Sequence, residues 1–313
     1  MSHSYQAILV IAFGGPLSPA EIRPFLARVT QGIPIPPERI EEVAHHYESV
    51  GGKSPLNEIT FRQAEALEKL LIEQGTPIPV YVGLRHSKPF FTETVKKMAD
   101  QGVERALGFI LSSHRTEASW ERYQKNIADA LAKLDGNAPQ VDFSGGWHDH
   151  PLFVQTWTEL IEAAFTDIAP GQRHATPLVF TAHSLPAPMA ACSPYVEQVN
   201  ASARLIAGNL GRTNWAIAYQ SRSGRPADPW LEPDIADTIR NLATQGFHEA
   251  VVAPIGFVCD HVEVLYDLDI EARKLAADLR MNLIRASCPN EHPTFIRMMA
   301  DVIQAELRAK QRM

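Results

Sequence analysis

Short apolar runs, rich in β-branched and aromatic residues, alternate along this chain with longer amphipathic stretches. The short runs have the length and composition of buried strands, and the stretches between them are long enough for helices. Such alternation is typical of βαβ units, in which helices connect parallel strands. We expect strands at residues 7–13, 80–84, 106–111, 141–145, 177–182, 215–220, 250–256 and 282–286.

Two helices have local end signals. Ser18, Pro19 and Glu21 place a cap residue, a proline at the first helical position and a glutamate in capping-box spacing. A second helix is expected over residues 57–74, because Gly75 follows as a C-terminal cap.

The segment 166–177 is the best candidate for a linker. It is polar, contains proline and glycine, and shows no periodicity. It divides the expected strands evenly, so we predict an N-terminal domain over residues 1–168 and a C-terminal domain over residues 169–313. The second domain would end in a final helix from about residue 291.

The two halves of the chain also resemble each other. Residues 98–111 and 242–255 each contain a helix end, then Gln-Gly, then a buried strand. We therefore predict an α/β fold of two similar, doubly wound, Rossmann-like domains, with parallel sheets that face a central cleft.

Bulk composition limits the partners. No apolar run reaches membrane-spanning length, and the chain enters its first strand without a basic leader, so we expect a cytoplasmic protein with no integral membrane segment. A net charge of -7 argues against nucleic acid and leaves room for a cationic ligand. We expect a monomer or a weak oligomer.

Cysteine usage argues against a disulfide framework or a metal cluster. Cys192, Cys259 and Cys288 are odd in number, widely spaced and free of any CxxC pattern. We expect no iron–sulfur cluster and no other bound cofactor.

Ligands of open parallel sheets bind beyond the carboxyl ends of the strands. His183, in the stretch AHSLP, occupies such a position, although a histidine there is more often a hydrogen-bonded structural group. Glu263 follows another buried strand and begins a row with Asp267 and Glu271, each four residues apart. On a helix these carboxylates share one face and repel one another unless a cation or solvent relieves them.

Two interpretations of this row remain open. One is a solvated acidic face near a helix N-terminus, where the helix dipole favours anions. The other is a site shared with His183, since imidazole and carboxylate together suit Fe²⁺, Co²⁺ or Zn²⁺. A neutral imidazole is also a competent general base near pH 7.

Other motifs are absent or ambiguous. The glycines after the first strand do not form GxGxxG, no P-loop occurs, and Ser184 lacks the glycines of a nucleophile elbow. The loop 222–235 carries Arg222, Arg225 and Trp230. It is either a rigid crossover or a wall that offers cations and an aromatic face to a ligand.

Four stretches carry a specific resemblance. AHSLP with CSPYVEQ, SRSGRPADPWLEPDI, PIGFVCDHVEVLYDLDIE and HYESVGGKSPLNEIT resemble the strongest motifs of the ferrochelatase family, in the expected order and over nearly the whole chain. The resemblance implies two Rossmann-like domains and insertion of Fe²⁺ into a porphyrin for heme biosynthesis. The expected partners are therefore a porphyrin and Fe²⁺.

The resemblance also implies roles for individual residues. His183 matches the active-site histidine of the family and Glu263 its partner carboxylate, so these two are the expected catalytic groups. The expected metal-binding set is His183, Glu263, Asp267 and Glu271, and the expected porphyrin-binding set is Phe13, Ser54, His86, Tyr123 and Trp230.

The short segment 29–43 and the stretch GLRHSKPF resemble the branch of the family that uses coproporphyrin III, which we favour over protoporphyrin IX. Phe13 stands where that branch has an iron-ligating tyrosine, and Thr30 where it has a basic residue. Two alternatives remain: a cobalt or nickel chelatase of a reduced tetrapyrrole, and a non-catalytic carrier of tetrapyrrole or metal.

Overall fold

The computed structural model describes residues 5–311, except residues 33, 135 and 224–227. The chain divides into two compact units, each with its own sheet and core. The first unit contains Met1–Ser112, Glu117–Gly146 and Glu291–Met313, and the second contains Ser113–Thr116 and Trp147–Asn290.

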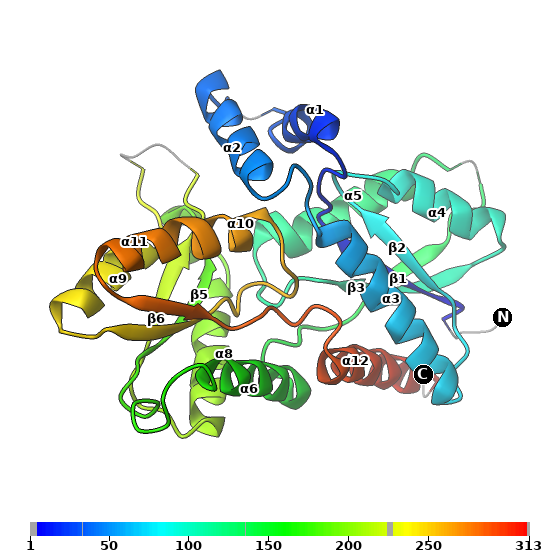
Figure 1. Cartoon of the computed structure of the whole chain (residues 1–313). Coiled ribbons are helices and arrows are strands. Elements are labelled where there is room, and N and C mark those ends of the chain that lie inside the picture. The colour runs from blue at the N-terminus through cyan, green and yellow to red at the C-terminus, as the bar shows by residue number, and fades with distance from the viewer. Residues whose placement is uncertain (1–4, 33, 135, 224–227, 312–313) are drawn as a thin grey trace. The chain divides into compact units, whose positions relative to one another are not determined.

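The first unit contains a four-stranded parallel sheet (Figure 1). Its strands are β1 (Ala7–Ala12), β2 (Val80–Leu84), β3 (Arg105–Ile110) and β4 (Gln140–Phe143). Their order is β2-β1-β3-β4, so the chain leaves β1 in one direction and later returns to its other side. Every residue of β1 is buried, as expected of a central parallel strand.

The second unit contains another four-stranded parallel sheet. Its strands are β5 (Leu178–His183), β6 (Trp215–Gln220), β7 (Glu249–Ala253) and β8 (Asn282–Arg285). Their order, β6-β5-β7-β8, repeats that of the first sheet. All eight predicted strands are therefore confirmed, and so are the two similar α/β units. The strand order reverses between β1 and β3 and between β5 and β7, where such sheets form crevices.

Helices cover both faces of the first sheet. The helical segments of this unit are α1 (Pro19–Val29), α2 (Pro37–Ser49), α3 (Leu56–Glu73), α4 (Phe91–Asp100), the π-helix η1 (Glu117–Glu121), α5 (Arg122–Leu131) and α12 (Pro293–Gln311). One face shares a core with α4 and α5. The helix α3 packs on β2, and α12 packs against α3 (Figure 1).

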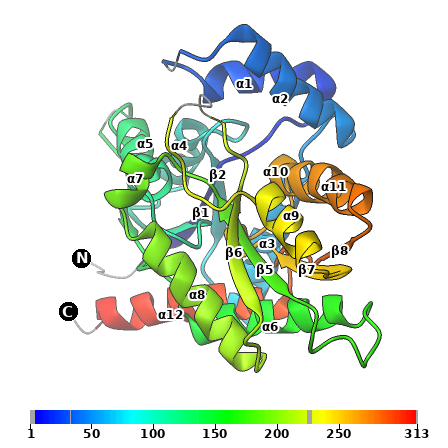
Figure 2. The same cartoon turned by 90° about the vertical axis from the view of Figure 1, so that its left-hand side faces the viewer.

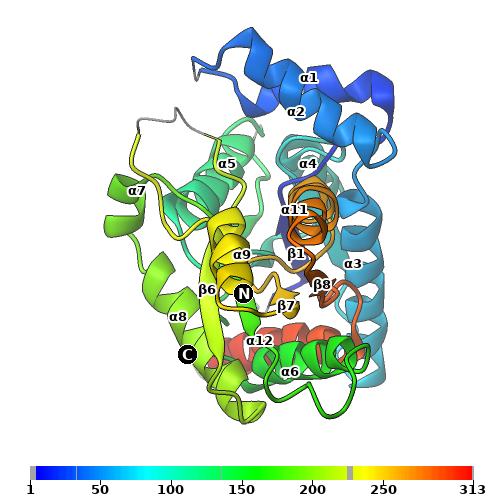
Figure 3. The same cartoon turned by 60° about the vertical axis from the view of Figure 1, so that its left-hand side comes forward.

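Helices also cover the second sheet. The helical segments here are α6 (Pro151–Phe165), α7 (Ala187–Ala191), α8 (Tyr195–Asn209), α9 (Ile235–Thr244), α10 (Val262–Leu265), the π-helix η2 (Asp267–Ala272) and α11 (Arg273–Asp278). One core joins the sheet to α9 and to the run from α10 to α11 (Figure 3). The helices α6 and α8 pack on each other and on the sheet (Figure 2).

Several of the described helices are amphipathic and bury one face in the core of their unit. The helix α9, for example, buries Ile235, Ile239 and Leu242 and leaves the opposite face to solvent. Within the described part of the chain, no helix is both long and apolar enough to cross a membrane.

The division of the chain differs from the predicted boundary after residue 168. The second unit already begins at Trp147, and α6 belongs to it. The final helix belongs to the first unit, where Glu306 accepts a hydrogen bond from the Gly145 backbone N–H at 3.1 Å. The segment 166–177 connects α6 to β5 within one unit. A polar loop marks a turn, but the contacts of the flanking helices decide the unit to which it belongs.

The predicted helix ends are confirmed only in part. Gly75 follows α3 with a positive φ of 76°, as its capping role requires. Ser18 is the N-cap residue of α1, but its side chain makes no cap hydrogen bond. Glu21 instead accepts from the Leu17 backbone N–H at 3.0 Å, so the predicted capping box is wrong in detail.

Candidate active site

The site lies at the carboxyl edge of the second sheet, where the strand order reverses. His183 is the last residue of β5, and the chain beyond β7 turns into α10, which carries Glu263. Gly256 makes this approach possible, because a Cβ atom at that position would lie 2.7 Å from the Ala182 Cα atom. The loop after β7 therefore lies directly against the end of β5.

His183 and Glu263 face each other across this edge. The His183 Nε2 atom lies 3.6 Å from the Glu263 Oε1 atom, and the two side chains are 29% and 42% exposed. Both groups are thus held by the fold and still accessible to a ligand.

The pairing sets the charge of both groups. Burial alone would lower the pKa of His183, but the Glu263 carboxylate outweighs it and raises that pKa to about 9. Burial alone would raise the pKa of Glu263, but the His183 imidazolium lowers it to about 2. At neutral pH the site without ligand therefore holds an imidazolium–carboxylate pair, whereas the sequence reasoning assumed a neutral imidazole.

Two contacts orient His183. Its Nδ1–H donates to the Ser184 carbonyl, which leaves Nε2 directed at Glu263. The Tyr195 hydroxyl donates to the His183 carbonyl at 2.9 Å and fixes the end of the strand. Sequence reasoning missed Tyr195, although it lies within the CSPYVEQ stretch that the resemblance includes.

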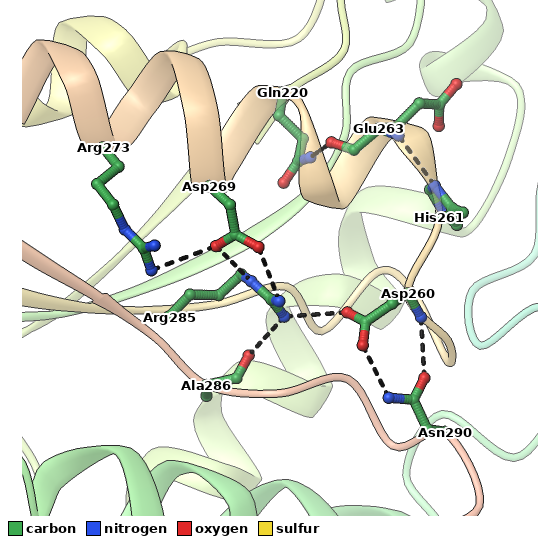
Figure 4. A network of polar contacts seen from close by, with 9 residues as sticks. All are labelled: Gln220, Asp260, His261, Glu263, Asp269, Arg273, Arg285, Ala286 and Asn290. Carbon is green, nitrogen blue, oxygen red and sulfur yellow. Dashed lines mark hydrogen bonds and ion pairs between the residues drawn. The ribbon is translucent and has the colours of Figure 1, made fainter. Parts of the chain in front are cut away.

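Gln220 and His261 position Glu263. The Gln220 carboxamide accepts from the Thr181 hydroxyl and donates to the Glu263 carbonyl, each at 2.7 Å. The Glu263 backbone N–H donates to His261 Nδ1 at 3.1 Å, so His261 caps the start of α10. Burial lowers the pKa of His261, which keeps the ring neutral and able to accept. Figure 4 shows the Glu263 carboxylate pointing away from Gln220.

The acidic row continues into a π-helix, where an ordinary α-helix was expected. The backbone N–H of Glu271 donates to the Tyr266 carbonyl at 3.0 Å, a five-residue hydrogen bond. Burial raises the pKa of Asp267 to about 7, with Glu263 and Glu271 adding to the rise, even though the Ser221 hydroxyl donates to its carboxylate. Asp267 is therefore a carboxyl group that exchanges protons near neutral pH.

The four groups expected to bind metal do not converge at one point. Within the described residues, no three histidine, cysteine, aspartate or glutamate side chains are arranged to hold a metal ion. The structure brings His183 and Glu263 together and places Asp267 where their charges affect it.

A buried ion network fixes the segment that carries the row (Figure 4). The Arg285 guanidinium donates to both carboxylate oxygens of Asp269 at 2.9 Å and to Asp260 Oδ1 at 3.0 Å. Asn290 donates to the other Asp260 oxygen at 2.8 Å. Burial would lower the pKa of Arg285, but Asp269 and Asp260 raise it, so the guanidinium stays charged. Arg285 thereby joins the loop before α10 to η2.

Four of the expected porphyrin contacts, Phe13, Ser54, His86 and Tyr123, belong to the first unit. Phe13 follows β1, is 36% exposed and lies with its ring centroid 4.6 Å from that of His86. Burial lowers the pKa of His86 to about 3, and the charges of Arg85 and Arg28 add to this effect, so the ring is neutral. Phe13 thus offers an apolar surface backed by an uncharged imidazole.

Ser54 and Tyr123 are more enclosed than a direct ligand contact requires. Ser54 is 2% exposed, and its hydroxyl accepts from the Leu56 backbone N–H at 3.3 Å. Tyr123 is 6% exposed and lies beneath the Arg85 guanidinium, which is 5.8 Å from its ring centroid.

Trp230 belongs to the loop that follows β6, and this loop is docked beside the end of β5. The Ser184 hydroxyl donates to the Leu231 carbonyl at 3.0 Å, and Trp230 forms a β-bridge with Pro186. The loop therefore supports the segment after His183, as expected of a rigid crossover. Arg225 lies outside the described residues.

The comparisons with known proteins agree on one family. A sequence profile of the family named ferrochelatase matches residues 5–307. A coproporphyrin III ferrochelatase of Mycolicibacterium smegmatis is 39% identical over 307 residues, which cover 97% of this chain and 90% of the relative. The enzyme of the same name from Mycobacterium avium is 43% identical over 310 residues, with coverage of 97% and 88%.

The fold has a known counterpart among solved structures. SirB from Bacillus subtilis, solved with Fe³⁺, superposes with a TM-score of 0.59 over 98% of this chain and 97% of its own, at 11% sequence identity. At that identity the likeness concerns the fold alone. The profile, which extends through both units, and the two relatives at about 40% identity show that the chain belongs to the ferrochelatase family.

Proposed function

We propose that this protein inserts Fe²⁺ into coproporphyrin III, with release of two protons, as a ferrochelatase of heme biosynthesis. Family membership and the names of the relatives support the reaction. The observation that carries the mechanism is the His183–Glu263 pair at the point where the second sheet reverses its strand order.

The reaction needs acceptors for two pyrrole protons and a negative group that attracts the metal. Glu263, whose pKa lies far below neutral, supplies a permanent negative charge. Fe²⁺ that approaches this carboxylate repels the proton of His183 and favours the neutral imidazole. The proton that His183 loses leaves to solvent. As the metal enters the ring, the imidazole accepts one pyrrole proton, releases it and accepts the second, and Glu263 stabilises the imidazolium each time.

Asp267 is our candidate for passing protons onward. Its pKa of about 7 lets it take up and release protons at neutral pH, and it lies within the charge influence of both His183 and Glu263. Glu271 continues the row one turn farther along η2. The row thus connects the pair to solvent for protons leaving the site and for the metal arriving.

Phe13 and Trp230 are the proposed aromatic contacts of the macrocycle, supported by His86, Ser54 and Tyr123. The cleft in which both units would hold the ring, the cytoplasmic location and the weak or absent oligomerisation remain predictions. We further propose that catalysis needs no bound cofactor, since three cysteines do not provide the four thiolates of an iron–sulfur cluster.

Anaerobic insertion of Fe²⁺ into coproporphyrin III and protoporphyrin IX, measured side by side, tests the proposal. We expect a measurable kcat/KM for each porphyrin and a higher value for coproporphyrin III. A reversed preference would refute the substrate assignment. A panel of Fe²⁺, Co²⁺ and Ni²⁺ with a reduced tetrapyrrole tests the alternative chelatase, which would prefer Co²⁺ or Ni²⁺ and the non-aromatic ring.

A further inference from the structure

A cavity of about 650 Å³ opens at the amino edge of the second sheet. Its lining comes from the segment before β5, the turn between α9 and β7, and the turn between α11 and β8. The His183–Glu263 pair lies at the opposite, carboxyl edge of the same sheet, where His183 ends β5. The proposed reaction therefore leaves this cavity without a role. We call it the amino-edge pocket.

Contacts within the second unit hold the walls of the amino-edge pocket in place. On one side, Arg212 donates to the Thr176 carbonyl at 3.1 Å, and the Thr176 hydroxyl donates to the Gln172 carbonyl at 3.0 Å. On the other side, the Asn282 backbone N–H donates to the His248 carbonyl at 2.8 Å and joins the two turns. The chain's own hydrogen bonds thus shape the pocket, and its volume is within the range of small-molecule sites.

Two opposite charges line the amino-edge pocket without pairing. Arg280 lies in the turn after α11, and Glu249 is the first residue of β7. Within the described part of the chain, neither side chain has an ion-pair partner, although both line one cavity. Opposite charges that share a cavity but do not meet are placed to bind the two ends of one ligand.

Arg280 occupies a backbone position at which four comparable turns of this chain have glycine. The residue after the C-cap has a positive φ in each of them: Gly75 after α3, Gly102 after α4, Gly211 after α8 and Gly246 after α9. Arg280 holds the same place after α11, with a φ of 59°. A Cβ atom strains this conformation, which glycine adopts freely. The arginine thus costs stability, and what it adds is a guanidinium group at the pocket.

Phe247 gives the amino-edge pocket an apolar surface. Its ring is half-buried and packs against the core of the second unit, so it is fixed beside Glu249 and still lines the pocket. An aromatic or aliphatic group of a ligand packs well on such a surface. The pocket therefore combines a cation, a carboxylate and an aromatic ring, which complement the carboxylate, the ammonium group and the side chain of an amino acid.

We propose that the amino-edge pocket binds a free amino acid with a large apolar side chain. The Arg280 guanidinium binds the carboxylate, Glu249 binds the ammonium group, and Phe247 packs against the side chain. Glu249 repels a simple anion and Arg280 repels a simple cation, so a zwitterion fits better than either. The inference is independent of the proposed reaction, because the pocket and His183 lie at opposite edges of the sheet.

Isothermal titration calorimetry of the full chain with three probes tests the proposal. The probes are L-phenylalanine, 2-phenylethylamine, which lacks the carboxylate, and 3-phenylpropionate, which lacks the ammonium group. The variants are Arg280→Gly, Glu249→Gln and the control Lys274→Met, which removes an exposed cation of α11 that does not line the pocket. Arg280→Gly relieves the strained turn, so its Tm should be at least that of the wild type.

We expect L-phenylalanine to bind to the wild type, and the other two probes to bind about tenfold more weakly, since each leaves one charge of the pocket unpaired. Arg280→Gly and Glu249→Gln should each raise the Kd of L-phenylalanine about tenfold, and Lys274→Met should leave it unchanged. In Glu249→Gln, 3-phenylpropionate should bind more tightly than to the wild type, because no carboxylate repels it.

Four results would overturn the proposal. The first is no binding of L-phenylalanine at millimolar concentration, and the second is an unchanged Kd in both Arg280→Gly and Glu249→Gln. The third is equal affinity for 3-phenylpropionate and L-phenylalanine, which would show a site for anions. The fourth is displacement of L-phenylalanine by coproporphyrin III, which would place the amino acid at the carboxyl edge. If Arg280→Gly proves less stable than the wild type, Glu249→Gln alone decides the second test.

Discussion

His183 is protonated at neutral pH in the site without ligand, because the Glu263 carboxylate 3.6 Å away stabilises the imidazolium. A general base that begins the reaction protonated must first lose that proton. The incoming Fe²⁺ favours this loss, because its positive charge replaces that of the proton beside Glu263. Arrival of the metal thereby converts His183 into the neutral form that accepts a proton.

Replacing His183 by alanine tests whether this residue is the proton acceptor. We expect His183→Ala to abolish Fe²⁺ insertion, because Glu263 then has no partner that accepts pyrrole protons. Porphyrin binding should persist, since the proposed ring contacts lie elsewhere. Anaerobic insertion assays and fluorescence titration of the same preparation separate the two effects. Turnover that survives the substitution would contradict the assignment.

The pH dependence of the pair is a second test at this scale. Because the pKa of His183 is raised from 6.5 to about 9, its contribution to stability is complete below pH 6.5 and is lost as pH rises through 9. The pKa of Glu263 is lowered from 4.5 to about 2, so its contribution is complete above pH 4.5 and is lost toward pH 2. The pair is therefore most stabilising between about pH 4.5 and 6.5.

In Glu263→Gln the strongest effect opposing the burial of His183 is lost, so its pKa should fall well below that of the wild type, although the Ser184 carbonyl and Asp267 still raise it. Titration of the histidine ring signals by NMR in wild type and variant measures this change. A ring that still titrates near pH 9 in the variant would show that Glu263 is not the cause.

At the scale of elements, Arg285 holds the acidic segment in place. Its guanidinium joins Asp260, which precedes α10, to Asp269 within η2, and its side chain is only 13% exposed. Arg285→Met leaves Asp260 without its cation and leaves Asp269 with only the more exposed Arg273, which should lower the free energy of unfolding by about 3 kcal/mol. Urea unfolding monitored by circular dichroism measures the loss.

The matched control for Arg285 is Arg240→Met. Arg240 pairs with Asp237 on α9, but the two side chains are 56% and 71% exposed. Its removal should change the free energy of unfolding by about 0.5 kcal/mol or less. Equal losses in the two variants would mean that the buried network has no special role.

The strands were predictable from the sequence, but the helix that carries the acidic row was predictable only in outline. Buried parallel strands appear as apolar runs, and His183 and Glu263 were expected at the site because both follow such runs. The π-helical turn carries Asp269, which binds Arg285 of β8, and the charge on His183 depends on Glu263, so both features involve contacts distant in sequence. Neither leaves a periodic signal.

At the scale of the molecule, the final helix belongs to the unit that the chain enters first. Arg62 of α3 pairs with Glu291 at 2.8 Å, and Gln304 donates to Gln74 at 2.6 Å. The sequence places this helix after the last strand of the second unit, so chain order alone assigned it to the other domain. Only the pairing of its apolar face with α3 decides the question.

Removal of the residues after 290 should therefore weaken the first unit, although α12 follows the last strand of the second unit in the sequence. We expect faster amide exchange in α3 and β2, because the truncation uncovers the α3 face, while β5 to β8 keep their protection. Hydrogen exchange with mass spectrometry resolves the two units. Greater loss of protection in the second unit would contradict the assignment of α12.

The π-helix has a consequence for sequence change in this protein. A π-turn contains one residue more than the α-turn it replaces, so deleting a single residue such as Ile270 would restore regular winding. Everything on one side of the deletion would then rotate by about 100° relative to the other side. With α11 anchored to β8, the rotation would fall on α10 and swing Glu263 away from His183. Deletion of one residue would thus inactivate the site, although all the side chains of the site would remain in the chain.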